Sequence, residues 1–241
     1  MRFIIIRKAD ADTEARKAPT HELAVAMMAY NDEMAKAGIL LGGDGLRPTA
    51  DGFRVRFADG KPTVIDGPFT EAKELVGGFA LMRVRSKEEA ISWCDKFAAV
   101  LGDVELFMGP VVEPWDLGMM PKPKNPPLRF LSLQQVNEKS KDEAPPDPEH
   151  MAKMGALIDE MKKAGVLQAT GGLAGTKKGA RIRYDGGKPT VIDGPFAESK
   201  ELIAGYAIVD LPSKAAAIEW ALRFGDVVKV NEIDVRQMPE S

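Results

Sequence analysis

An α+β fold built from two ferredoxin-like βαββαβ units is predicted by two observations. First, the string Gly-Lys-Pro-Thr-Val-Ile-Asp-Gly-Pro-Phe occurs at 60–69 and again at 187–196. The same separation of 127 residues carries Gly38 onto Gly165, which indicates a duplicated domain rather than a shared motif. Second, strand and helix patterns follow each other in both copies in the order β-α-β-β-α-β with an inserted hairpin, which is the ferredoxin-like pattern.

Each copy begins with an apolar strand and an amphipathic helix. Apolar residues recur at helical spacing in both copies. Thr20 and Asp147 occupy matching N-cap positions. Gly38 and Gly165 are expected to end the two helices, because glycine adopts the left-handed conformation that follows a helix C-terminus. The expected strands are Phe3–Ile6 and Phe130–Gln134. The expected positions on the helix face are Leu23, Met27, Tyr30 and Met34, with the counterparts His150, Met154, Leu157 and Met161.

A hairpin, a further strand, a second helix and a last strand complete each copy. Asp59-Gly60 and Gly186-Gly187 predict tight hairpin turns. Ser86 and Glu89 form a capping-box pattern at the start of the second helix, and Ser213 keeps only the cap. The expected strands are Phe53–Phe57 and Arg181–Tyr184, Thr63–Ile65 and Thr190–Ile192, Phe79–Val84 and Tyr206–Leu211, and finally Val104–Met108 and Val227–Ile233.

The domain organisation predicted from the repeat is a unit at 1–114, a linker at 115–127 and a second unit at 128–241. The linker contains four prolines and two lysines, which favours a stiff, extended connector. Two helices cover only one face of a four-stranded sheet, so the other face needs a partner that the second copy can supply. An intramolecular pseudo-dimer is therefore expected, and a further homodimer remains open.

The composition excludes several classes of protein. A net charge of −3 gives no sign of a nucleic-acid surface. One cysteine excludes an internal disulfide, and two histidines cannot build a typical zinc site. No signal peptide or membrane-length apolar stretch is recognisable. A cytoplasmic protein with neither metal nor organic cofactor, and with no membrane partner, is expected.

The segments 66–74 and 193–201 resemble the signature of the DGPF group of YCII-related proteins, and Gly77-Gly78-Phe79 and Gly205-Tyr206 continue the likeness. The resemblance covers nearly all of both halves. It implies a dimeric α/β barrel, in which two ferredoxin-like sheets face each other around a cleft, but no established reaction for the DGPF group. Wider relatives are thought to use a His–Asp pair, and one type looks like a dehalogenating enzyme. Here His21 lies near the expected histidine position, but its counterpart is Pro148.

The candidate catalytic residues lie in and directly after the repeated motif. Asp66 and Asp193 end a strand beside Gly-Pro, so they can act as bases if they project into a cleft. The alternative is that Asp-Gly-Pro serves only as a turn. The charged residues that follow are candidate acid/base and anion-positioning groups, or else a solvated helix face. These residues are Glu71, Lys73, Glu198 and Lys200.

Arginines are the candidate substrate-binding residues. Arg54 and Arg56 share one face of a strand, as do Arg181 and Arg183, so both pairs can hold a carboxylate if that face lines the barrel interior. If the face meets water, they are ordinary surface charges. Arg47 occurs only in the first copy, where the second has Ala174.

Two functional hypotheses follow. In the first, the protein binds a small anionic metabolite in an inter-repeat cleft and performs cofactor-independent acid/base chemistry of the isomerase, lyase or dehalogenase type. In the second, the same cleft belongs to a non-catalytic ligand-binding or regulatory module linked to sigma-factor signalling, a setting that the resemblance implies. The copies differ at Tyr30, Asp44 and Arg47, so the two sites are expected to be unequal, with the N-terminal one better equipped.

Overall fold

In a computed structural model, the strands form two six-stranded antiparallel sheets, each with its own pair of long helices. The structure describes residues 1–17, 19–70, 75–136, 147–195 and 202–239. The chain divides into two compact units. Unit 1 contains the described residues of 1–48 and 173–241 together with Thr70, and unit 2 contains those of 49–69 and 75–172. The α+β class and the ferredoxin-like repeat units predicted from the sequence are confirmed.

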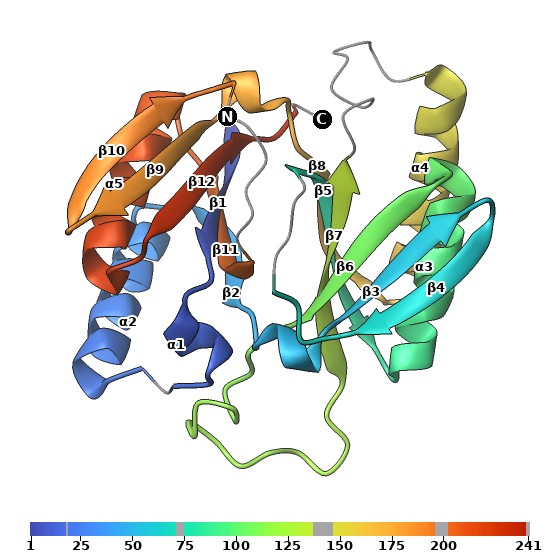
Figure 1. The fold of residues 1–241 in the computed structure, drawn as a ribbon, viewed down its shortest axis with the longest axis horizontal. Coiled ribbons are helices and arrows are strands. Elements are labelled where there is room, and N and C mark those ends of the chain that lie inside the picture. Colours follow the sequence, from blue (N-terminus) through green and yellow to red (C-terminus); the bar gives the residue numbers. More distant parts are fainter. Residues whose placement is uncertain (18, 71–74, 137–146, 196–201, 240–241) are drawn as a thin grey trace. The chain divides into compact units, whose positions relative to one another are not determined.

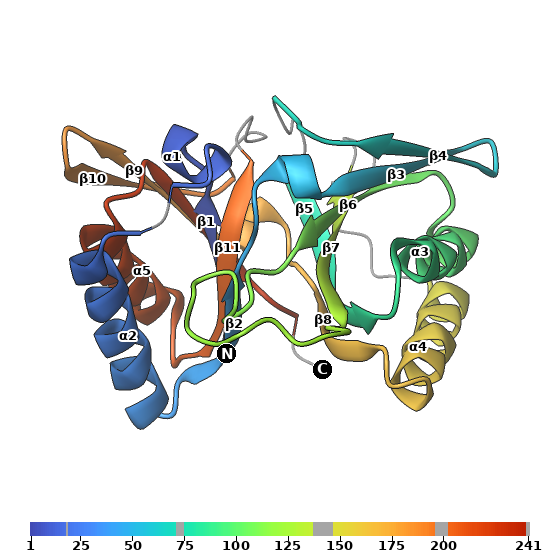
Figure 2. The same ribbon diagram turned by 90° about the horizontal axis from the view of Figure 1, so that it is seen from below.

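Unit 1 holds the sheet with the strand order β10-β9-β12-β1-β11-β2, here called sheet 1. Helices α2 and α5 lie side by side along one face of it (Figures 1 and 2). A short helix, α1, follows β1 and was not predicted from the sequence. The elements are β1 (Arg2–Lys8), α1 (Ala11–Glu14), α2 (His21–Lys36), β2 (Leu40–Gly45), the 3₁₀ helix η3 (Thr176–Lys178), β9 (Ala180–Asp185), β10 (Lys188–Asp193), β11 (Ile203–Asp210), α5 (Lys214–Val228) and β12 (Glu232–Gln237).

Unit 2 holds the sheet with the order β4-β3-β6-β7-β5-β8, called sheet 2. Helices α3 and α4 pack side by side in this unit, as Figure 2 shows. The elements are the 3₁₀ helix η1 (Thr49–Asp51), β3 (Phe53–Ala58), β4 (Lys61–Asp66), β5 (Leu75–Val84), α3 (Lys87–Leu101), β6 (Val104–Pro110), β7 (Leu128–Val136), α4 (Pro148–Lys163) and β8 (Leu167–Gly172).

Each sheet combines strands of both sequence repeats. In sheet 1, β1 from the first repeat pairs on both sides with strands of the second, β11 and β12. In sheet 2, β7 from the second repeat pairs with β5 and β6 of the first. The β-α-β start of each repeat is therefore completed by the hairpin-β-α-β remainder of the other. The two repeats form a pseudo-dimer in this sense, and the boundaries of the compact units differ from those of the repeats.

The exchange makes unit 2 continuous in the chain from η1 to β8, whereas unit 1 joins the two ends of the chain. Residues 115–127 connect β6 and β7, which are neighbours in sheet 2, and this segment begins in hydrogen-bonded turns. The arrangement of the two units as one barrel stays a prediction.

Local sequence signals account for most element boundaries. The Thr20 hydroxyl accepts from the Leu23 N–H at 3.2 Å, and the Asp147 carboxylate accepts from the Glu149 N–H at 3.2 Å, so both predicted N-caps are confirmed. Gly38 and Gly165 follow their helices with φ of 70° and 68°, in the left-handed region that disfavours other residues. None of the helices within the described residues is both long and apolar enough to cross a bilayer.

Two local predictions were wrong in detail. The predicted capping box is half formed, because Ser86 accepts from the Glu89 N–H but the Glu89 carboxylate accepts from the Arg85 N–H, one residue before the cap. The last strand was placed at Val227–Ile233, yet β12 is Glu232–Gln237. Val227 and Val228 continue helix α5, because their side chains pack into the core beneath it, and the chain turns at Lys229 with φ 54°.

The core of each unit lies between its sheet and its helices. In unit 1, alternate residues of the central strands, such as Phe3, Ile233 and Val235, pack against α2 and α5. In unit 2, Phe53, Met82 and Leu106 pack against α3 and α4 in the same way. The alternation leaves the intervening side chains on the opposite, helix-free side of each sheet. That side carries the polar residues considered below.

We expect a fragment of residues 49–172 to fold by itself, because it contains all six strands and both helices of unit 2. A fragment of residues 1–114, the first sequence repeat, lacks the strands that complete either sheet. It should fold only as a dimer whose copies exchange their first strands. Circular dichroism melting and light scattering test both fragments. A cooperatively folded monomer of 1–114 would contradict the strand exchange.

Candidate functional site

The repeated Asp-Gly-Pro-Phe turns dock onto the 3₁₀ helices. The Gly67 N–H donates to the Gly52 carbonyl at 3.1 Å, and the Gly194 N–H donates to the Gly179 carbonyl at 3.2 Å. A Cβ on Gly67 would lie 1.9 Å from the Thr49 carbonyl oxygen. On Gly194 it would lie 1.7 Å from the carbonyl oxygen of Thr176. Only glycine allows this backbone approach, so the glycine that the two motifs share has a packing cause.

The two motif aspartates form ion pairs with lysines at helix starts. The Asp66 carboxylate pairs with the Lys87 ammonium at the start of α3. The Asp193 carboxylate pairs with the Lys214 ammonium at 2.7 Å, at the start of α5. The aspartate side chains are 71% and 72% exposed. Exposed pairs of this kind contribute little to stability, at most about 1 kcal/mol.

The other predicted acid/base residues are not brought together with these aspartates by the described structure. Glu71, Lys73, Glu198 and Lys200 lie outside the described residues. His21 is the first residue of α2 and is exposed. Arg47 follows β2 and is half-buried. The acid/base roles of the motif residues and of His21, and the substrate-binding role of Arg47, stay predictions.

The predicted arginine pairs occupy equivalent places on the helix-free sides of the two sheets, and each is bridged by one glutamate. On sheet 2, the Glu105 carboxylate lies 3.4 Å from Arg54 Nη1 and 2.6 Å from Arg56 Nε. On sheet 1, the Glu232 carboxylate lies 3.2 Å from Arg181 Nε and 2.8 Å from Arg183 Nε. The inner arginine of each pair is mostly buried and the outer one is exposed. The surface-charge interpretation therefore describes only the outer residues.

In unit 2 the inner arginine also contacts the motif. The Arg54 guanidinium lies over the Phe69 ring at 4.2 Å, and Phe69 meets the Phe107 ring edge-on. The Phe69 N–H donates to the buried Thr49 hydroxyl at 3.1 Å. These contacts fix the Phe of the motif against the strand that bears the arginine pair. Its counterpart Phe196 lies outside the described residues.

Unit 1 extends its arginine pair into a group of charges, buried except for Arg183 and called here the charged cluster: Lys8, Arg181, Arg183, Glu232, Asp234 and Arg236. Lys8 comes from β1 of the first repeat, and the other members come from β9 and β12 of the second. The Asp234 carboxylate contacts Lys8 Nζ at 3.0 Å and Arg181 Nε at 2.7 Å. Lys8, Asp234 and Arg236 were not singled out from the sequence. The alternation of charged and apolar residues at 232–236 was the available signal.

Arg236 is the least satisfied member of the charged cluster. It is 3% exposed, and its Nη2 donates to the Ala174 carbonyl at 2.7 Å. Its Nε has no hydrogen-bond partner within the part of the chain that is described. Burial, helped by the nearby Arg181 charge, lowers the Arg236 pKa to about 10, although Asp234 acts in the opposite direction. The guanidinium is therefore still charged at neutral pH.

Burial alone would raise the pKa of the Asp234 carboxyl, but the Lys8 and Arg181 charges outweigh it and hold the pKa below its usual range. Asp234 is therefore ionised at neutral pH, and its stabilising effect is lost only as the pH falls through this lowered pKa. In the described residues, no group of three or more histidine, cysteine or carboxylate side chains has the arrangement of a metal site.

The family model of the YCII-related domain matches the chain twice, over residues 1–105 and 129–227. The chain belongs to the YCII-related family. It carries the domain as a tandem duplication. It is also 34% identical over 75 residues to an uncharacterized protein of Rhizobium meliloti (strain 1021). That match covers 31% of this chain and 60% of the relative, so the chain spans less than two thirds of the relative's length. No solved structure matches the chain.

Replacing the motif glycine should destabilise unit 2 strongly. In Gly67→Ala the new methyl group overlaps the Thr49 carbonyl, so we expect a loss of about 1–3 kcal/mol or more. The matched control is Gly155→Ala in α4, where a Cβ meets no atom within 4 Å and should stabilise the helix by roughly 0.5–1 kcal/mol. Urea unfolding measures both changes. A neutral effect of Gly67→Ala would contradict the packing role of the motif.

Proposed function

We propose that this YCII-related protein binds a small anionic metabolite at the charged cluster of unit 1. Arg236 carries the proposal, as a buried guanidinium whose Nε lacks a partner in the described residues. A buried N–H donor without a hydrogen-bonding partner is costly, and such donors are usually satisfied by a water, an ion or a ligand. Carboxylate and phosphate groups suit a guanidinium well, because each has several oxygens that accept from its N–H donors at the same time.

The balance of charge supports an anion rather than a cation. The charged cluster contains four cationic side chains and two carboxylates, Glu232 and Asp234. Asp234 is already shared by Lys8 and Arg181, and Glu232 by Arg181 and Arg183. A monovalent or divalent anion beside Arg236 would offset the remaining positive charge. Arg183 is the exposed member of the cluster, and we expect an anion to reach the site past its side chain.

Comparison with unit 2 supports one strong anion site, located in unit 1. Where unit 1 has Lys8, Asp234 and Arg236, the equivalent positions of unit 2 hold Gln135, Phe107 and Gly109. Unit 2 keeps only Arg54, Arg56 and Glu105 of the set. We infer that Arg181 and Arg183 bind the ligand tightly, and that Arg54 and Arg56 bind it weakly. The sequence analysis also predicted unequal sites but expected the N-terminal one to be better equipped, whereas the tighter site proposed here uses arginines of the second repeat.

Binding without chemistry is the function that the described geometry supports best. The motif aspartates are exposed and paired with lysines, and they belong to the turns rather than to the charged cluster. Asp66 and Asp193 as bases, an inter-repeat cleft and a regulatory role in sigma-factor signalling all stay predictions. Loss of turnover in Asp193→Asn, once a substrate is known, would favour the enzyme hypothesis.

We expect phosphate and small mono- and dicarboxylates, tested one at a time, to include at least one anion that raises the melting temperature by several degrees. An anion that binds only the folded protein stabilises it by mass action. Arg236→Gln keeps a donor for the Ala174 carbonyl but removes the charge, so it should abolish the shift. Without ligand it should not lower the melting temperature, because an uncompensated buried charge is lost.

The matched control is Arg83→Gln, which removes an exposed arginine of β5 in unit 2. It should leave the anion-dependent shift unchanged. The proposal fails if no anion stabilises the wild type, or if Arg236→Gln retains the full shift.

A further inference from the structure

Unit 1 also contains a cavity of about 170 Å³ between α2 and the neighbouring end of sheet 1. Met27 and Met34 of α2 and Phe224 of α5 line it from the helix side. Gly43 of β2 and Ala207 of β11 line it from the sheet side. It lies on the helix-facing side of the sheet, whereas the charged cluster is on the helix-free side. The two features therefore use different surfaces.

Small residues on the sheet create this space. Gly43 pairs with Ala207 and Gly45 pairs with Gly205, so no large side chain rises toward α2 from either strand. Gly43 and Gly45 lie on the edge strand and are exposed, which opens the cavity to solvent beside β2. In the second repeat, Thr170 takes the place of Gly43, and its hydroxyl donates to the Phe79 carbonyl. The cavity is thus a feature in which the two repeats differ.

The size and walls suit an apolar body the size of a benzene ring. An apolar cavity of about 150 Å³ is large enough to bind benzene. Methionine side chains adapt to an aromatic guest and contact it favourably. Tyr30 offers only its aromatic ring to a ligand. Its hydroxyl donates to the Trp220 carbonyl at 2.8 Å, and burial raises its pKa above the usual value. That hydroxyl is therefore a committed donor and offers no charge to a ligand.

One polar side chain that lines the cavity, Arg7, has an N–H donor with no partner among the described residues. Arg7 of β1 lines it, and Arg7 Nη2 donates to the Asp10 carboxylate at 3.3 Å and to the Thr13 hydroxyl at 3.1 Å. Arg7 Nε is buried and has no hydrogen-bond partner among the residues that the structure describes. The ligand therefore needs an acceptor oxygen next to its apolar body. In the second repeat this position is Gln134.

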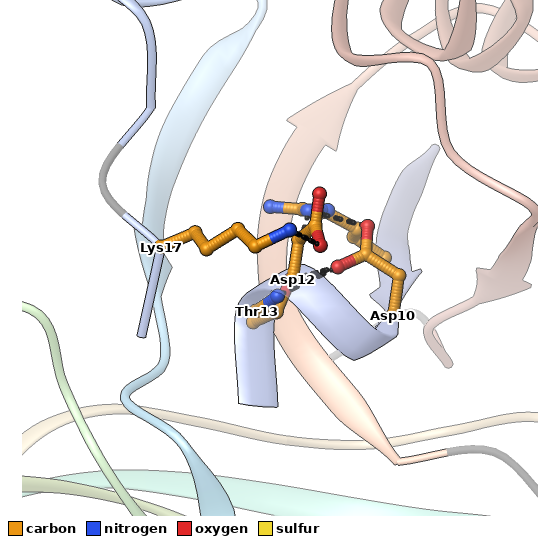
Figure 3. Close-up of polar contacts among 5 residues, drawn as sticks. Asp10, Asp12, Thr13 and Lys17 are labelled. Carbon is orange, nitrogen blue, oxygen red and sulfur yellow. Dashed lines mark hydrogen bonds and ion pairs between the residues drawn. The ribbon is translucent and has the colours of Figure 1, made fainter. Parts of the chain in front are cut away.

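Helix α1 holds the partner of Arg7 in place. Figure 3 shows the Asp10 carboxylate facing Thr13 across the first turn of α1, with Lys17 reaching Asp12 on the same short helix. Asp10 accepts from both the N–H and the hydroxyl of Thr13 at 2.7 Å. Burial would raise the pKa of Asp10, but these bonds and the Arg7 charge outweigh it and hold the pKa below its usual range. Asp10 therefore stays ionised and neutralises Arg7.

This neutralisation decides the charge of the ligand. The Arg7 charge is balanced by the Asp10 carboxylate, so the cavity lining offers no net positive charge to a ligand. A second carboxylate brought by a ligand would be repelled and would lose its hydration. We propose that this cavity binds a neutral, benzene-sized molecule with one carbonyl-type oxygen, which accepts from Arg7 Nε. The site is additional to the anion site of the charged cluster.

Three probes of nearly equal size test the assignment on the full chain: acetophenone, ethylbenzene and benzoate. Protein labelled with ¹³C at the methionine methyl groups reports the location. Acetophenone should shift the Met27 and Met34 signals saturably. It should leave Met154 and Met161, the counterparts of these residues in α4, unchanged. Ethylbenzene lacks the acceptor and should bind about tenfold more weakly or worse. Benzoate should also bind at least about tenfold more weakly.

Filling the cavity should remove the binding. Ala207→Leu inserts a branched side chain from the sheet, and Gly43→Thr installs the residue that the second repeat has there. Either variant, if folded, should lose the acetophenone shifts, whereas Arg236→Gln should keep them. The proposal is overturned if acetophenone does not shift Met27 and Met34 saturably in the wild type, or if ethylbenzene or benzoate binds as tightly. Unchanged binding in a folded filled variant would overturn it as well. If neither variant folds, the methyl shifts and the ranking of the probes in the wild type decide.

Discussion

Backbone pairing between the two repeats is the constraint on which the rest of the structure depends. Strand β1 is central in sheet 1, and both of its neighbours come from the other repeat. Strand β7 has the same position in sheet 2. Without these strands each sheet would separate into two pieces. The core of each unit, between its sheet and its helices, would also lose its central residues. Because the pairing is antiparallel and continuous over most of each strand, it also fixes which side chains face the helices.

The exchange explains why the residues of functional interest in unit 1 come from opposite ends of the chain. Lys8 lies beside Asp234 only because β1 is paired with β12. The cavity likewise joins α2 and β2 of the first repeat to β11 and α5 of the second. Each repeat therefore contributes strands to both sheets, and unit 1 contains charges and small residues that unit 2 lacks.

The repeated motif and the features that differ between the repeats have separate roles. In both copies the motif glycine approaches a carbonyl so closely that no other residue fits, and the motif aspartate pairs with a lysine. This packing accounts for the glycine that the two motifs share. The charged cluster and the cavity lie elsewhere, and both include positions where the copies differ, such as Lys8, Arg236 and Gly43.

Local physical rules predicted much of this fold. The N-caps at Thr20 and Asp147, the glycines that end the first helices and the hairpins at Asp59-Gly60 and Gly186-Gly187 each depend on a few neighbouring residues. The last strand was misplaced because Val227 and Val228 favour a strand by themselves, whereas burial in the core keeps them in α5. The arginine pairs were found from their spacing, but the glutamates that bridge them and the buried partners Lys8 and Arg236 were not.

By itself the sequence determined the duplication, the α+β class, the order of the main strands and long helices and the membership of the YCII-related family, because a repeat, a periodicity or a motif indicates each of these. Only the tertiary structure decided which strands pair. The equivalent strands of the two copies carry the same alternation, so pairing within a repeat and pairing between repeats satisfy the pattern equally well. The choice depends on packing between residues more than a hundred positions apart, and the charged cluster and the cavity follow from that choice.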